Sequence, residues 1–378
     1  MAEPFKNFLD AALVRQAARN LSRAWPGFDA KRFTRLANAN LEALELKARA
    51  MQICAALEAT LPDDFLRAAQ VIEAALAPAP AGDEPAVQAA MGDDGLRGWV
   101  LWPVGEFVAR RGLAQPERAL AALHALTQRF TAEFALRPFI VAHPALSFAT
   151  LSRWCSDSSP HVRRLASEGS RPRLPWGLRL QSLVADPAPT LSLLRALQDD
   201  PSACVRRSVA NHLNDIAKDH PGQVCEWVET HLPGAPPGRV ALLRHASRTL
   251  IKQGNVRMLH AWGLGAPMRG AASLHVAPPG VRLGESLTLT LTLVSRAPQA
   301  QSLAIDYVVH HVKADGRTTP KVFKGWQVTL PPRGELTLVK RHSMRVVTTR
   351  RYHAGRHGLS VQVNGREVAR ADFELVTA

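Results

Sequence analysis

Residues 100–260 contain an internal repeat, and this feature restricts the possible folds more than any other in the sequence. Two segments, IVAHPA at 140–145 and LVADPA at 183–188, match at an offset of 43 residues. The same offset relates Asp157 to Asp200 and a Val-Arg-Arg triplet at 162–164 to its copy at 205–207. A period near 40 is typical of HEAT-like repeats, in which each helix pair buries its apolar face by stacking on its neighbours. A weaker third copy spans 240–254.

The first 77 residues carry helical patterns throughout. Apolar residues recur at helical spacing over 41–57. Asp29 and Asp63 precede two further helical segments, at 31–39 and 65–76, and we expect the two carboxylates to cap them. The segment 77–82 is rich in alanine and proline, ends the helical pattern and predicts a surface loop.

After residue 265 the hydrophobic period changes from helical to alternating. Leucine and threonine alternate strictly over 287–293, and Asn364-Gly365 joins two strand-like runs as a two-residue hairpin turn. Tyr352, just before a predicted strand, resembles the tyrosine corner of an immunoglobulin-type sandwich. We therefore predict a mainly α chain, with a HEAT-like helical-repeat solenoid at 1–265 and an all-β, immunoglobulin-like sandwich at 266–378.

The net charge of +15 is unevenly distributed along the chain. Residues 1–100 carry −2, residues 101–265 carry +8 and residues 266–378 carry +9. Two consecutive basic regions indicate a polyanionic partner, because phosphate contacts supply most of the non-specific affinity for nucleic acid. A solvated basic surface that keeps the chain soluble is the alternative.

Several classes of protein are disfavoured by what the sequence lacks. It has no run of 18 apolar residues and no secretory signal pattern, and its four cysteines lie far apart. We therefore expect a cytoplasmic protein without membrane association or a disulfide framework. Motifs for phosphate-binding loops, dinucleotide binding, zinc proteases and nucleophile elbows are missing as well, so we expect no metal and no other cofactor. No oligomerisation signal is clear, and we expect a monomer.

One predicted helix, at 205–220, combines an apolar stripe with a basic, polar face. The apolar stripe consists of Val209, His212, Leu213 and Ile216. The polar face carries Arg207, Asn211, Asp215 and Lys218. One interpretation is an ordinary solvated ladder of charges, which contributes a few tenths of a kcal/mol per pair. The other is that the cations bind phosphates while Asp215 directs one negative charge at a cationic group.

Three further residues can each be interpreted as structural or as functional. Glu168 and Trp176 belong to a rigid, basic segment that follows a helix, and Trp176 stands between a proline and a glycine. Trp176 is either a core anchor for the loop between repeats or a functional residue. Glu133 has apolar neighbours and either pairs with Arg137 four residues later or serves the same site.

Five segments together are similar to one family of bacterial proteins. They are PFKN at 4–7, LEALELKAR at 41–49, RFTAEF at 129–134, ASEGSRPRLPW at 166–176 and VRRSVANHLND at 205–215. Over about residues 1–260 the chain resembles the AlkC family of DNA alkylation repair proteins, and the C-terminal sandwich resembles the immunoglobulin-like extension of one branch of that family. The two longest segments, which contain Glu168 and Asp215, are the most specific.

The resemblance implies a monofunctional alkylpurine and alkylpyrimidine DNA glycosylase, a hydrolase of base excision repair. Its substrates would be cationic bases such as 3-methyladenine and 3-methylcytosine in duplex DNA, cleaved without enclosing a flipped base. Alkylation makes the base a neutral leaving group that needs little acid catalysis, while positive charge develops on the deoxyribose. Carboxylates suit such a site.

By motif position, the resemblance also implies residue roles. Glu133, Glu168 and Asp215 would face the lesion, Asp215 would orient the attacking water, and Trp176 would pack against the damaged nucleotide. The candidate DNA contacts are Arg163, Arg164, Arg171, Arg173, Arg206, Arg207, Asn211 and Lys218. The basic sandwich would close on the other side of the duplex. Two rival interpretations are a non-catalytic HEAT-repeat scaffold and a structure-specific DNA-binding protein that releases no base.

Overall fold

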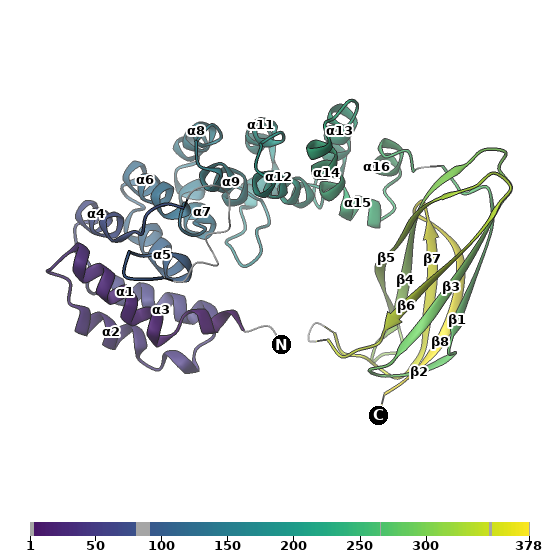
Figure 1. Cartoon of the computed structure of the whole chain (residues 1–378), viewed down its shortest axis with the longest axis horizontal. Helices are drawn as coiled ribbons and strands as arrows, with labels where there is room; N and C mark the ends of the chain where they lie inside the picture. The colour runs from purple at the N-terminus through teal and green to yellow at the C-terminus, as the bar shows by residue number, and fades with distance from the viewer. Residues whose placement is uncertain (1–3, 81–90, 265, 348–349, 378) are drawn as a thin grey trace. The chain divides into compact units, whose positions relative to one another are not determined.

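The computed structural model describes residues 4–80, 91–264, 266–347 and 350–377. The chain forms two compact units, residues 1–219 with 235–246 and residues 220–234 with 247–378. The first unit is helical, and the second contains the strands together with a few short helices (Figure 1). The predicted fold class is therefore confirmed, while the division at residue 265 stays a prediction.

The first unit consists of short helices in close succession. They are η1 (Phe5–Phe8), α1 (Ala11–Ala24), α2 (Ala30–Asn38), η2 (Leu41–Ala43), α3 (Leu46–Glu58), α4 (Phe65–Ala75), η4 (Gly98–Val100), α5 (Leu101–Arg111), α6 (Pro116–Thr127), α7 (Glu133–Ala142), α8 (Pro144–Trp154), α9 (Pro160–Gly169), α10 (Gln181–Ala185), α11 (Ala188–Leu197), α12 (Ala203–Ile216) and α14 (Pro237–Ala246). The second unit contains α13 (Pro221–His231), α15 (Arg248–Lys252) and α16 (Val256–Ala261). Among the described residues, no helix has both the length and the apolar character needed to cross a bilayer.

The N-terminal helices follow the predicted pattern with two local corrections. The Asp29 carboxylate accepts a hydrogen bond from the backbone N–H of Arg32 and caps α2, as predicted. Asp64, not Asp63, caps α4, because the cap is the residue directly before the first helical residue. The apolar segment 41–57 is not one helix, since the 3₁₀ turn η2 ends before α3 begins.

The loop predicted at 77–82 is also corrected in part. Ala77 is buried, and its backbone N–H donates to the carbonyl of Leu96. The first residue of this segment is therefore fixed inside the unit, while residues 81 and 82 lie outside the described residues.

The repeat of 43 residues corresponds to stacked helix pairs. Helices α8 and α9 form one pair, and α11 and α12 form the equivalent pair. Helix α9 packs on α12 and α8 packs on α11, so equivalent helices lie in two rows (Figure 1). This stacking is the arrangement expected of HEAT-like repeats.

The recurring sequence landmarks build the loop that enters each inner helix. The Arg163 Nη1 atom donates to the carbonyls of Asp157 and Ser158. The equivalent Nη1 atom of Arg206 donates to the carbonyls of Asp200 and Pro201. Both aspartates also accept a hydrogen bond from the backbone N–H two residues later. These residues therefore recur because each loop needs the same internal hydrogen bonds.

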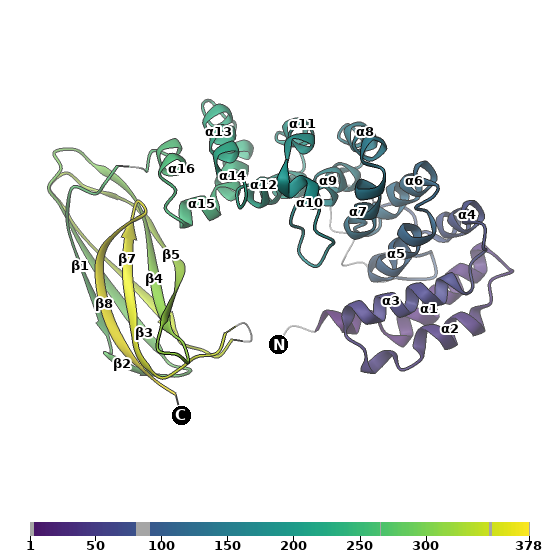
Figure 2. The same ribbon diagram turned by 180° about the vertical axis from the view of Figure 1, so that it is seen from behind.

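The second unit contains two sheets. Their strands are β1 (Gly270–Ala277), β2 (Gly280–Arg282), β3 (Ser286–Ser295), β4 (Gln301–Val312), β5 (Thr318–Leu330), β6 (Glu335–Ser343), β7 (Gly355–Val363) and β8 (Arg366–Val376). One sheet has the order β1-β3-β6 and the other β2-β8-β7-β4-β5. Strands β8, β7, β4 and β5 lie side by side in Figure 2.

The alternating sequence pattern places one face of each sheet in a shared core. The four leucines of β3, at 287, 289, 291 and 293, are fully buried. Asn364 and Gly365 both have positive φ angles, as the predicted hairpin between β7 and β8 requires. The Tyr352 ring packs against His311. The tyrosine corner at this position stays a prediction.

His311 and His342 are two of the three histidines that are buried inside the sandwich, and His357 is the third. Burial, with a further contribution from Arg350, lowers the pKa of His311 to about 3 and that of His342 to about 4. The His342 Nδ1 atom lies 3.0 Å from the Tyr307 hydroxyl, and the Phe323 ring packs edge-on against the same imidazole. The folded sandwich therefore holds both imidazoles neutral.

We expect the sandwich to lose stability as the pH falls below about 6.5. Above that pH both histidines are neutral in the folded and unfolded states, whereas below it the unfolded state alone gains their protons. His311 and His342 should then each cost about 2 kcal/mol at pH 5. His357, whose pKa burial also lowers, adds to this loss. Pulse proteolysis in urea at pH 7.5 and pH 5, with sandwich peptides quantified by mass spectrometry, measures the change.

His342→Gln should remove its own share of this pH dependence, about 2 kcal/mol at pH 5, and His275→Gln should leave the dependence intact because His275 is exposed. Equal urea midpoints for the wild type at the two pH values would contradict the prediction.

Candidate active site

Helix stacking brings the three predicted carboxylates together. Glu133 is the first residue of α7, Glu168 lies in the last turn of α9, and Asp215 lies in the last turn of α12. Helix α9 packs against both α7 and α12. All three side chains are buried, with relative exposures of 9%, 6% and 2% for the residues in chain order. The interpretation of Asp215 as part of a solvated ladder of charges is therefore wrong, because its side chain is buried. Lys218 lies beyond the end of α12.

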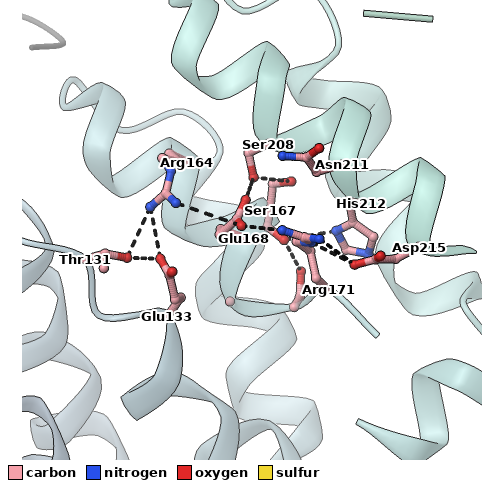
Figure 3. A network of polar contacts seen from close by, with 12 residues as sticks. Thr131, Glu133, Arg164, Ser167, Glu168, Arg171, Ser208, Asn211, His212 and Asp215 are labelled. Atoms are coloured by element: carbon pink, nitrogen blue, oxygen red, sulfur yellow. Dashed lines mark hydrogen bonds and ion pairs between the residues drawn. The ribbon is translucent and has the colours of Figure 1, made fainter. Parts of the chain in front are cut away.

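The carboxylates alternate with three cations in a row that we call the charge ladder. Its members, in spatial order, are Glu133, Arg164, Glu168, Arg171, Asp215 and Lys218. Figure 3 shows the ladder from Glu133 to Asp215. With every group ionised, the charges sum to zero.

Each arginine of the ladder joins two carboxylates. The Arg164 Nη1 atom lies 3.0 Å from Glu133 Oε2, and its Nη2 atom lies 3.9 Å from Glu168 Oε1. The Arg171 Nη1 atom donates to Glu168 Oε1 at 2.5 Å, while its Nε and Nη2 atoms each lie 2.8 Å from Asp215 Oδ2. A guanidinium suits this task because its donors point in several fixed directions within one plane.

Burial affects the two glutamates differently. Burial would raise the pKa of Glu168, but Arg164, Arg171 and a hydrogen bond from Ser208 outweigh it and hold that pKa below its ordinary value. Burial raises the pKa of Glu133, and Arg164 offsets this effect only in part. Glu168 is therefore firmly ionised at neutral pH, and Glu133 is the more readily protonated of the two.

A second layer of hydrogen bonds orients Glu168. The Ser208 hydroxyl donates to Glu168 Oε2 at 2.6 Å and lies 3.1 Å from the Ser167 hydroxyl. His212 Nδ1 donates to the Ser167 carbonyl at 2.9 Å, and burial lowers the pKa of His212 to about 3. Ser208 is buried on α12 next to Val209, the first residue of the apolar stripe, and no sequence motif marks it as a site residue.

A buried arginine fixes the loop that carries Trp176. Arg137 does not pair with Glu133, since its guanidinium donates to the carbonyls of Gly169 and Leu178 at the two ends of this loop. Trp176 is 67% exposed, has a φ angle of 64°, and makes an edge-on ring contact with Phe5. Trp176 is therefore not a core anchor, and its indole is accessible.

A pocket of about 480 Å³ opens beside the ladder. Aromatic rings from η4, α5, α7 and the nearby loops line it, namely Trp99, Trp102, Phe130, Phe134 and Trp176. Glu133, Arg164, Glu168 and Arg171 form its charged wall. The site thus combines apolar, stackable surface with ionised carboxylates. No group of three or more potential metal ligands occurs among the residues that the structure describes.

The predicted DNA contacts fall into three groups. Arg163 and Arg206 are held by backbone carbonyls, and Arg163 also forms two hydrogen bonds with Asp200, so both belong to repeat packing. Arg164 and Arg171 belong to the charge ladder. The remaining candidates, which lie toward the surface, are Arg173, Arg207, Asn211 and Lys218. Arg173 pairs with Asp219, Asn211 contacts His245, and Lys218 pairs with Asp215.

Comparisons with known proteins cover the whole chain. Residues 270–377 match the family of C-terminal Ig-like domains of the uncharacterised protein YhaZ. The chain is 34% identical over 378 residues to the uncharacterised protein YhaZ of Bacillus subtilis (strain 168), which spans 98% of this chain and 99% of that protein. It is also similar to the structure of Pseudomonas fluorescens alkylpurine DNA glycosylase AlkC bound to DNA containing an abasic site analog. That match has a TM-score of 0.90 and 36% identity, and covers 99% of this chain and 100% of the other.

The similarities to YhaZ and to AlkC both extend over the helical region and the C-terminal sandwich. Both exceed 30% identity, and the matched Ig-like domain coincides with strands β1–β8. The chain therefore belongs to the AlkC and YhaZ family, in the branch that carries a C-terminal immunoglobulin-like domain.

Proposed function

We propose that this protein is a DNA glycosylase of base excision repair that hydrolyses the N-glycosidic bond of cationic alkylated bases. The observation that carries the proposal is the presence of three buried carboxylates beside an aromatic pocket, in a chain similar over its whole length to a DNA glycosylase. We infer that 3-methyladenine and 3-methylcytosine in duplex DNA are its substrates. The same proposal includes action as a monomer, in the cytoplasm and without a cofactor.

The mechanism follows from where charge moves during cleavage. An alkylated base carries a positive charge, and the base departs neutral once the bond electrons move onto its ring. Positive charge meanwhile grows on the deoxyribose. Preorganised carboxylates stabilise that charge without reorganisation, and they act more strongly in a water-poor site than in bulk solvent. Glu133, Glu168 and Asp215 supply such charges, and Asp215 orients the water that attacks the sugar.

The accessible side chains supply recognition. The exposed indole of Trp176 packs against the damaged nucleotide, so the base need not be flipped into an enclosed cavity. Arg173, Arg207, Asn211 and Lys218 contact the DNA backbone from the surface of the helical unit. The basic sandwich contributes further contacts with the DNA backbone. Arg163 and Arg206 do not contact DNA in this proposal, and they stabilise the loops that position the inner helices.

Release of methylated bases from alkylated duplex DNA tests the proposal. We expect wild-type protein to release 3-methyladenine and 3-methylcytosine, and Glu168→Gln to lower the rate at least about a hundredfold because an ionised group beside the sugar is lost. Chromatography of the released bases, with protein in excess over DNA, measures this rate. Glu229→Gln is a matched control, since Glu229 forms an exposed pair with Arg257 in α16.

Each negative result points to a specific alternative. Salt-dependent DNA binding without any base release by clean wild-type protein would favour a structure-specific DNA-binding protein. Weak DNA binding together with no release would favour a HEAT-repeat scaffold for a protein partner. Unchanged release by Glu168→Gln would remove Glu168 from the mechanism.

A further inference from the structure

The two oxygens of the Asp215 carboxylate have different surroundings. Oδ2 faces the interior, where Arg171 approaches it from two donor atoms at 2.8 Å. Among the described residues, Oδ1 has a single polar contact, with Lys218 Nζ at 2.8 Å. The Asp215 side chain is 2% exposed, whereas that of Lys218 is 43% exposed. Lys218 thus covers the solvent side of a buried carboxylate.

Lys218 is the cation of the ladder that is least firmly held. Arg164 and Arg171 each bridge two carboxylates and are at most one-quarter exposed. Lys218 contacts one carboxylate, follows the last residue of α12 and has no other side-chain partner among the described residues. Its ammonium is a point charge on a flexible stem, so it can exchange one anion for another without movement of the backbone.

We propose that Lys218 transfers from Asp215 to a phosphate of the DNA backbone when the duplex binds. The transfer leaves Asp215 fixed by Arg171 and exposes Oδ1 toward the sugar. It also changes the formal charge of the ladder from zero to −1, so the negative charge appears only when DNA is present. This inference rests on the proposed function for the role of Asp215, but the exchange of ion pairs is a property of DNA binding alone.

A double-mutant cycle of DNA binding tests the exchange without any chemistry. The four proteins are wild type, Asp215→Asn, Lys218→Met and the double variant, and the probe is a duplex with a non-cleavable abasic-site analogue. Fluorescence anisotropy at fixed salt gives each dissociation constant. If binding breaks the pair, Asp215→Asn should tighten binding about five- to tenfold when Lys218 is present. With methionine at 218 the same change should have at most about a twofold effect, due to the lost negative charge alone.

The salt dependence provides a second readout. Lys218→Met should lower the slope of log affinity against log salt by about 0.9, which corresponds to one phosphate contact. Asp215→Asn should leave this slope unchanged. Arg118→Met and Glu73→Gln form a matched control cycle, because this pair joins α6 and α4 at 2.7 Å within the same unit, and its coupling should be close to zero.

Two outcomes would overturn the exchange. A cycle without coupling would show that DNA binding does not break the pair, and an unchanged salt slope in Lys218→Met would show that Lys218 binds no phosphate. Circular dichroism of each variant checks that it is folded. Because no base is released in these measurements, their failure is distinct from failure of the glycosylase proposal, which only the base-release experiment decides.

Discussion

Asp215→Asn is expected to lower the single-turnover rate of base release about a thousandfold while the protein still binds DNA. A favourable charge pair at about 4 Å contributes roughly 4 kcal/mol at an effective dielectric constant near 20. If that interaction forms only in the transition state, its loss costs about three decades in rate. Asparagine keeps the shape of the side chain and removes the charge. Release from alkylated duplex under single-turnover conditions separates this chemical effect from binding.

Asp199→Asn is the matched control for this experiment. Asp199 pairs with Arg239 near the surface of the same helical unit, outside the charge ladder. Its replacement should leave the rate within about twofold. A rate for Asp215→Asn within tenfold of wild type would show that another group stabilises the charge on the sugar.

Arg171→Met should destabilise the helical unit by about 3–5 kcal/mol. Arg171 is the buried link between Glu168 and Asp215, and its removal leaves two buried carboxylates short of a partner. Breaking one side of a buried ion pair costs this much because the remaining charge is poorly solvated. For a unit of this size the loss corresponds to a fall in Tm of about 10 °C. Thermal unfolding followed by circular dichroism at 222 nm reports the helical unit.

Arg239→Met provides the comparison on stability. Arg239 pairs with Asp199, whose side chain is 45% exposed, so its loss should cost less than about 1 kcal/mol. Equal effects of the two arginine substitutions would indicate that water enters the ladder and solvates the carboxylates that Arg171 leaves behind. Arg171→Lys should fall between wild type and Arg171→Met, because lysine restores the charge but cannot bridge two carboxylates in fixed geometry.

Periodicity and local chemistry explain what could be predicted from the sequence. The offset of 43 residues predicted stacked helix pairs, since its landmarks are the internal hydrogen bonds of the loop before each inner helix. Alternation over 287–293 and the Asn364-Gly365 turn predicted buried strands and a hairpin, because both depend on neighbouring residues. The cap at Asp64 and the break in the helix at 44–45 could not be predicted from periodicity, because a helix end is decided by a single residue.

The partners of the site residues could not be predicted in the same way. Helical spacing suggested that Glu133 pairs with Arg137, yet Glu133 pairs with Arg164 and Arg137 binds two backbone carbonyls. Several candidate phosphate contacts proved to be held inside the protein, among them Arg163. Interactions between residues 31 to 44 positions apart depend on how helices stack, and no local pattern records that choice.

The sequence by itself determined the class of each region, its repeat and the three carboxylates, because periodicity, turn residues and motifs are properties of short segments. Only the tertiary structure decided that these carboxylates share a buried ladder with Arg164 and Arg171, that Trp176 is exposed, and that Lys218 covers Asp215. The physical reason is that the stacking of α7, α9 and α12 sets both the distance between charges and their exclusion from water. Those two quantities determine the strength of every electrostatic interaction in the site.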